Sequence, residues 1–290
     1  MLSFIGVVDA ATVGRSRNAA NRAPIRASLS ERTPVRRQDR AHPQLSDSGD
    51  FLAGDALRGR KLAGKPLIEW VARRMTEAAQ LTGVVASLEE TSAGRALQRS
   101  LPPDIPALFS EAPDRLSRLL ELAGEYRADA LVRVPLGSPF VDGLLIDRLC
   151  QEARQTTCDY LSYRSNAFDM PVGGCVSIPL GVAGEWISAE ALRRMDAMAR
   201  DFADRDAPAE FISRYSDQFR LEYLPLPNPL DRDDLRLTIQ GEEDWDHTET
   251  ILDALDPDEW DWRRVAGLLE NQPRLRSRMA ELNAVEAAGY

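Results

Sequence analysis

Apolar residues recur along the chain with two periods, and the two periods alternate. Short apolar runs at 4–8, 82–87 and 130–134 are typical of buried β-strands. The stretches 64–80 and 111–129 instead carry apolar residues three and four positions apart, which is typical of amphipathic helices. A further helical stretch follows the third strand. Alternating strands and helices predict an α/β fold, in which helices cover both faces of a mainly parallel sheet.

The pattern becomes less regular in the second half of the chain. We predict strands at 159–163, 171–181, 219–227 and 235–239, and helices at 141–154, 188–203, 244–255 and 260–282. No internal repeat is visible. We therefore expect a single domain over 1–290 whose last part, 250–290, consists of helices.

Charge is distributed unevenly along this sequence. The net charge is −10, but residues 15–40 contain eight arginines against Glu31 and Asp39. That segment therefore carries about +6 and the remainder about −16, a balance that argues against nucleic-acid binding. The stretch 15–55 lacks apolar periodicity, so we expect a long, Arg-rich mobile loop inserted after the first strand. Two interpretations are open: a solvated variable loop, or a supply of arginines for a phosphate-bearing ligand.

Several kinds of site do not fit the residues that the chain contains. Its three cysteines match neither a disulfide framework nor a metal-ligand spacing, and it has only two histidines. No P-loop or dinucleotide fingerprint occurs. We therefore expect no haem, flavin, zinc or NAD. No apolar run of about 18 residues occurs, and the amino terminus is typical of a buried strand rather than a secretion signal. The expected location is the reducing cytoplasm, without membrane insertion.

Ligands of open parallel sheets lie outside the carboxyl ends of the strands. The loops that follow the first three predicted strands span 9–63, 87–95 and 135–142. Glycine amides and arginine side chains in such loops can hold phosphate. The candidates for this role are Gly14, Arg15, Arg17, Arg58, Arg60, Lys61, Ser87, Gly137 and Ser138.

The order of these segments resembles a known family. The central block LFSEAPDRLSRLLELAGEYRADALVRVPLGSPFVDGLLID, at 108–147, resembles that of the sugar cytidylyltransferases, in particular the branch named for spore-coat polysaccharide biosynthesis. That branch is related to the acylneuraminate and ketodeoxyoctonate cytidylyltransferases. Further segments that resemble the family in the correct order are 64–75, 180–195, 205–223, 235–255 and 268–283. The resemblance implies a Rossmann-like nucleotidyltransferase fold.

The resemblance also implies a reaction. Members of the family transfer CMP from CTP to a sugar hydroxyl and release pyrophosphate. Aspartate-bound Mg²⁺ and basic side chains ordinarily neutralise the developing charge. By this resemblance the phosphate candidates become nucleotide-binding candidates, and Glu185 and Arg205 become sugar-binding candidates. A nucleoside triphosphate and a sugar are the expected partners, and we expect a homodimer formed through 165–190.

The match is incomplete at charged positions. The family's glycine and final arginine after the first strand correspond to Gly14 and Arg17. A metal-associated aspartate of the central turn is replaced by Gly137, and another aspartate, after the last predicted strand, is replaced by Gln240. The nearby metal-ligand candidates are Asp142 and Glu242. Each has an alternative role, Asp142 as a helix cap and Glu242 as part of a solvated helix start.

Two alternatives therefore remain for the function. One is an active cytidylyltransferase in surface-polysaccharide biosynthesis, with shifted metal ligands. The other is a catalytically inactive homologue that binds a nucleotide or sugar, or that acts in assembly. Two interpretations are also open for Arg133, inside the third predicted strand: its side chain faces a phosphate, or it forms an internal ion pair.

Overall fold

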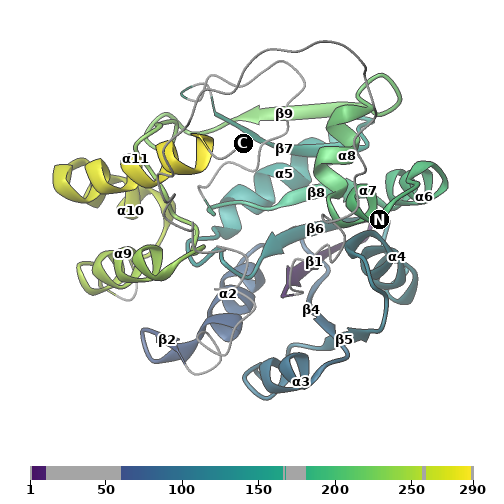
Figure 1. Cartoon of the computed structure of the whole chain (residues 1–290), viewed down its shortest axis with the longest axis horizontal. Coiled ribbons are helices and arrows are strands. Elements are labelled where there is room, and N and C mark those ends of the chain that lie inside the picture. The colour runs from purple at the N-terminus through teal and green to yellow at the C-terminus, as the bar shows by residue number, and fades with distance from the viewer. Residues whose placement is uncertain (1, 11–59, 166, 168–180, 257–258, 289–290) are drawn as a thin grey trace, which may run out of the picture.

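The computed structural model describes residues 2–10, 60–165, 167, 181–256 and 259–288. Among these residues the main sheet has seven strands, in the order β5-β4-β1-β6-β8-β7-β9 (Figure 1). The strands are β1 Phe4–Asp9, β4 Gly83–Glu89, β5 Ala107–Ser110, β6 Ala130–Pro135, β7 Tyr160–Arg164, β8 Glu185–Ser188 and β9 Leu221–Pro225. Strand β8 runs antiparallel to both of its neighbours, and the other pairs are parallel.

Helices lie on both faces of the sheet. They are α2 Leu67–Thr76, α3 Ser92–Gln98, α4 Arg115–Glu125, α5 Gly143–Gln155, α6 Ala189–Met198, α7 Phe202–Asp206, α8 Pro208–Arg214, α9 Glu242–Asp253, α10 Trp262–Glu270 and α11 Pro273–Ala288. Phe4 and Val8 of β1 share a core with α2 and α5, whereas Ile5 and Val7 share one with α4, α6 and α8. Successive side chains of a strand point to opposite faces, so β1 contributes to both cores. The predicted α/β class is confirmed.

The carboxyl-terminal helices α9, α10 and α11 extend the first of these cores. Their buried residues, including Trp245, Leu269 and Met279, belong to the same cluster as Phe4 and Val8. In Figure 1 they lie together beyond the carboxyl end of β6. None of the helices in the described ranges has the length and apolar content that crossing a lipid bilayer requires.

Three of the predicted elements differ from the structure. The helix predicted over 188–203 ends at Met198, and a separate helix, α7, begins at Phe202. Residues 235–239 are buried in part but do not pair as a strand of the sheet. The helix predicted over 260–282 is divided into α10 and α11, because Pro273, which has no backbone N–H, begins a new helix. Strands β5 and β8 and helices α3 and α8 were not predicted. The strand predicted at 171–181 and the loop predicted at 15–55 lie outside the described residues, Gly181 excepted.

Helix α4 ends in a left-handed cap at a residue other than glycine. The amide of Ala128 donates to the carbonyl of Ala123 (2.9 Å), and that of Arg127 donates to Gly124 (3.2 Å). This is the hydrogen-bond pattern of a Schellman motif. Arg127 has a φ of 47°, a conformation that favours glycine because glycine has no Cβ.

We expect Arg127→Gly to stabilise the protein. The substitution removes the Cβ strain and should raise the free energy of unfolding by about 1 kcal/mol, measured by thermal and urea denaturation. Arg127→Ala is the control, because it removes the same side chain but keeps the Cβ. An equal gain from both variants would show that the guanidinium, not the backbone conformation, is responsible.

Candidate functional site

Strands β1, β4 and β6 end at one edge of the sheet. Asp9, the last residue of β1, is in register with Ser87 of β4 and Pro135 of β6. Two predicted phosphate-binding loops, those after β4 and β6, therefore start at the same edge, on either side of β1. The loop after β1 begins at the same edge, but its candidates Gly14, Arg15, Arg17 and Arg58 lie outside the described residues.

The turn after β6 is held by hydrogen bonds from distant parts of the chain. The carbonyl of Gly137 accepts from the amide of Ile239 (2.7 Å), which brings the segment before α9 against the turn. Ser138 is 1% exposed, and its amide donates to Pro135 (3.1 Å). Gly137 and Ser138 are thus brought next to residues near 240, and both are buried in the protein.

Asp142 has a structural role at this turn. Its Oδ1 accepts from the amides of Leu144 (2.9 Å) and Leu145 (3.3 Å), which caps α5, and its Oδ2 accepts from the amide of Trp262 (3.1 Å). The side chain is 3% exposed. Of the two interpretations of Asp142, the structure supports the cap.

Helix α2 and the carboxyl-terminal helices hold the same turn from its other side. Trp70 donates from Nε1 to the carbonyl of Pro139 (2.7 Å), and Arg74 donates to the carbonyls of Val141 (2.7 Å) and Trp260 (2.8 Å). The rings of Trp70 and Trp260 lie 4.7 Å apart. The turn after β6 is therefore fixed by three elements that are far apart in the sequence.

Arg60 and Glu242, predicted for nucleotide and for metal respectively, form an ion pair. Nη1 of Arg60 lies 2.7 and 2.6 Å from the two carboxylate oxygens of Glu242. The guanidinium also lies over the ring of Trp245, 4.3 Å from its centroid, in a cation–π contact. Lys61, which is exposed, lies in the first strand of a small hairpin, β2 Lys61–Leu62 and β3 Lys65–Pro66, that follows Arg60.

Gln240, which replaces an expected aspartate, belongs to a buried network. Its Oε1 accepts from Nη2 of Arg236 (3.0 Å). Arg236 also donates to both carboxylate oxygens of Asp244 (2.7 and 3.3 Å), and Asp244 accepts from the amides of Gln240 and Gly241. Asp244 therefore serves as the counter-ion of Arg236 and as a cap for α9.

A second polar network lies at the same edge, on the face of the sheet covered by α4. Nε of Arg133 and Nε of Arg115 donate to Oδ2 of Asp9 at 2.7 and 2.9 Å. Nη1 of Arg133 also reaches Glu185 on β8 (2.9 Å). Arg133 therefore forms an internal ion pair, which decides between its two interpretations. Ser87, 3% exposed, points to the same face, because it alternates with Ala86 and Leu88 of the opposite core.

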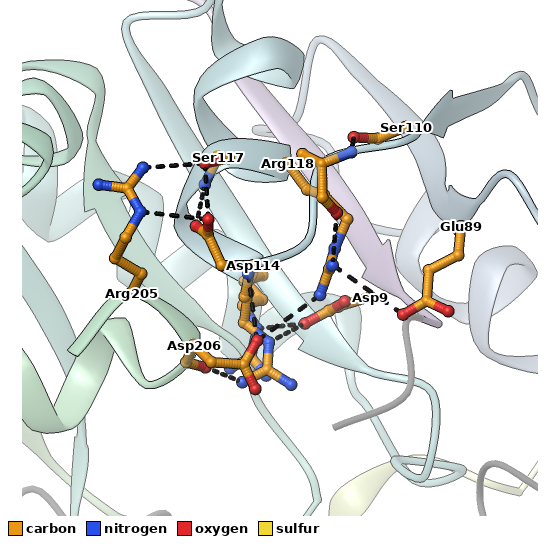
Figure 2. A network of polar contacts seen from close by, with 11 residues as sticks. Asp9, Glu89, Ser110, Asp114, Ser117, Arg118, Arg205 and Asp206 are labelled. Carbon is orange, nitrogen blue, oxygen red and sulfur yellow. Dashed lines mark hydrogen bonds and ion pairs between the residues drawn. The ribbon is translucent and has the colours of Figure 1, made fainter. Parts of the chain in front are cut away.

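The network continues around the start of α4 (Figure 2). Arg205 donates to Asp114 (3.1 Å) and to Ser117 (2.8 Å), and Arg115 donates to the carbonyl of Asp206 (2.5 Å). Arg118 is 2% exposed and lies 3.8 Å from Asp206, while its Nε and Nη2 have no hydrogen-bond partner among the described groups. The sugar candidates Glu185 and Arg205 thus lie in one network, each already paired within the protein.

Sequence reasoning missed Asp9, Arg115 and Arg118. The sequence contained a signal for Asp9, because it is a carboxylate at the end of an otherwise apolar strand. By alternation along the strands, Asp9 and Arg133 also occupy the same face of the sheet. The partner on α4 could not be found in this way, because it depends on how the helix lies on the sheet. The pKa of Asp9 reflects the cluster. Burial alone would raise it, but Arg133 and then Arg115 more than compensate and lower it to about 2.

A cavity of about 470 Å³ lies at the opposite edge of the sheet. Its lining includes Ile5, Val85, Asp104 and Tyr126 and none of the predicted site residues. The polar residues at the carboxyl ends, rather than this cavity, are therefore the candidate functional site.

Asp9→Asn should destabilise the protein by about 3 kcal/mol in urea denaturation, because it leaves two buried arginines without their shared counter-ion. Glu190→Gln is the matched control. It breaks an exposed pair with Arg193 and should change the free energy of unfolding by less than about 1 kcal/mol. Similar losses in both variants would contradict the central role of Asp9.

The stability that Asp9 provides should depend on pH. A pKa lowered to about 2 in the folded state, from an ordinary 3.8, gives stability that is complete above pH 4 and lost as the pH falls towards 2. The difference in unfolding free energy between the wild type and Asp9→Asn should therefore shrink between pH 4 and pH 2. A constant difference over this range would contradict the lowered pKa.

Comparison with known proteins supports the fold. No family model matches the chain. An uncharacterized protein of Methanocaldococcus jannaschii is 22% identical over 220 residues, which is 75% of this chain and 85% of that protein. A cytidylyltransferase from Leptospira borgpetersenii superposes with a TM-score of 0.68 at 14% identity, covering 94% of this chain and 95% of its own. A nucleotidyl transferase from Methanothermobacter thermautotroptrophicus gives 0.54 at 12% identity, covering 88% and 99%. The chain thus has the nucleotidyltransferase fold that its sequence resembles.

Proposed function

We propose that this protein is a nucleotidyltransferase that moves CMP from CTP to a sugar in surface-polysaccharide biosynthesis. The observation that carries the proposal is the likeness to the Leptospira cytidylyltransferase over nearly the whole of both chains. The carboxyl-end location of the polar residues supports it as well, because parallel sheets bind nucleotides at that edge. In this reaction a sugar hydroxyl attacks the α-phosphorus of CTP. The bond to the pyrophosphate breaks, pyrophosphate leaves and the hydroxyl gives up its proton.

In this proposal one group of residues binds the triphosphate and a second group binds the sugar. Arg60, which meets the start of α9, and Lys61 and Lys65 of the hairpin that follows it would provide positive charge for the triphosphate. The sugar would lie near the network of Asp9, Glu185 and Arg205, where carboxylates and guanidinium groups can accept from and donate to hydroxyls. Gly14, Arg15, Arg17 and Arg58 remain predictions for phosphate binding.

The described carboxylates do not fit a magnesium ion. Asp142 accepts backbone amides with both oxygens, and Glu242 directs both oxygens at Arg60. Asp244 is the counter-ion of Arg236. Among the described residues, no group of three His, Cys, Asp or Glu side chains could hold a metal ion. No step is therefore assigned to a metal bound by these residues.

The same observation favours a second candidate function. A catalytically inactive homologue would keep the fold and bind a nucleotide or sugar, or act in assembly, without needing the catalytic carboxylates. In either case we propose a cytoplasmic homodimer. The buried free thiols of Cys150 and Cys158 suit a reducing compartment.

Calorimetry and product analysis separate the candidates. We expect CTP to bind more tightly than ATP, GTP or UTP, and incubation with CTP and a panel of sugars to release pyrophosphate with formation of a CMP-sugar, detected by mass spectrometry. An active enzyme should turn over at roughly 1 s⁻¹ or faster with its own sugar. Binding without pyrophosphate release would favour the inactive homologue. Absence of binding by all four triphosphates would contradict both nucleotide-binding functions.

A further inference from the structure

Arg60 and Glu242 form a charged pair of the site that faces solvent, as Arg205 and Asp196 also do. The side chain of Glu242 is 63% exposed and that of Arg60 is 26% exposed. The buried carboxylates nearby differ in this respect, since Asp142 is 3% and Asp244 4% exposed. Exposed ion pairs are worth only about 0–1 kcal/mol, so this one can be exchanged for another partner at little cost.

The geometry of the pair also makes Glu242 a weak partner. Both of its contacts are made to the same nitrogen, Nη1 of Arg60. Elsewhere in the protein Arg73 and Arg95 each present two nitrogens to the two oxygens of one carboxylate, which is the stronger arrangement. A phosphate group carries more charge and more acceptor oxygens than a carboxylate, so it can displace Glu242 from Arg60.

Trp245 holds the guanidinium in place when the partner changes. Trp245 is 1% exposed and belongs to the main core, and the Arg60 guanidinium lies 4.3 Å from its ring centroid. This contact does not depend on Glu242. The following hairpin is anchored by Leu62, which is fully buried. Arg60 therefore stays at the start of α9 when Glu242 is displaced, and this helix start follows Ile239, whose amide contacts the turn after β6.

We infer that Arg60 binds a phosphate of the nucleotide without a divalent cation, and that Glu242 competes with this phosphate for Arg60. Glu242 then acts as an internal counter-ion that neutralises Arg60 until the nucleotide arrives, and not as a metal ligand. This inference rests on the proposed function, because it assumes that a nucleotide binds at the carboxyl ends of the strands.

The variant Glu242→Gln distinguishes a competitor from a metal ligand by the sign of its effect. Without the competing charge, CTP in the presence of EDTA should bind roughly two- to fivefold more tightly, as expected for the loss of an exposed ion pair. Arg60→Gln should weaken CTP binding about tenfold or more. Glu249→Gln is the matched control, since it removes the same charge from an exposed position two turns further along α9 and should leave the affinity nearly unchanged.

The CTP affinities are measured by isothermal titration calorimetry, on the full-length wild type and the three variants, with EDTA and with Mg²⁺. Tighter binding by Glu242→Gln alone, with wild-type binding retained in EDTA, supports the inference. Weaker or unchanged binding by Glu242→Gln, or wild-type binding that requires Mg²⁺, overturns it while leaving the proposed function in place. Absence of CTP binding by every protein, with unchanged circular dichroism, would contradict the proposed function and the inference with it.

Discussion

The arrangement of the strand ends depends on the buried carboxylate of Asp9. Arg133 links this carboxylate to β6 and, through Glu185, to β8, while Arg115 links it to α4. None of these charges is stable alone in a protein interior, because desolvation disfavours an unpaired ion. They become stable only when β1, β6, β8 and α4 are all in place. The cluster therefore joins assembly of the sheet to the position of the helix that covers the candidate sugar-binding face.

On the other side of this edge, around the turn after β6, the acidic residues have different partners. The turn after β6 carries no carboxylate before Asp142, and this acid and the others around the turn are occupied by helix caps and by arginines. Asp142 and Asp244 are buried and accept backbone amides, and Asp244 also pairs with Arg236, whereas Glu242 is exposed and pairs with Arg60. Arg60 can therefore exchange its partner at this edge, whereas the carboxylates that could bind a metal are already paired. This difference in burial separates the acids that shape the fold from the one that can respond to a ligand.

Periodicity alone predicted the elements that have a regular apolar pattern. The strands β1, β4 and β6 and the helices α2, α4 and α5 were found because apolar spacing reports directly on burial. The segment 235–239 is apolar as well, but it packs against the turn at Gly137 by a hydrogen bond from Ile239 and joins no strand. An apolar run shows that a segment is buried, and it does not show which backbone groups pair with it.

The features of the candidate site also divide into those that the sequence determines and those that only the structure shows. The sequence by itself determined the α/β class, the edge at which charged residues gather, and the absence of the expected aspartates at Gly137 and Gln240. Only the tertiary structure decided which charged side chains form ion pairs with each other. Arg133 pairs with Asp9, Arg60 with Glu242 and Arg236 with Asp244, over separations of 124, 182 and 8 residues. The reason is physical: ion pairing depends on distance and burial, and for residues far apart in the chain both arise from the packing of helices on the sheet.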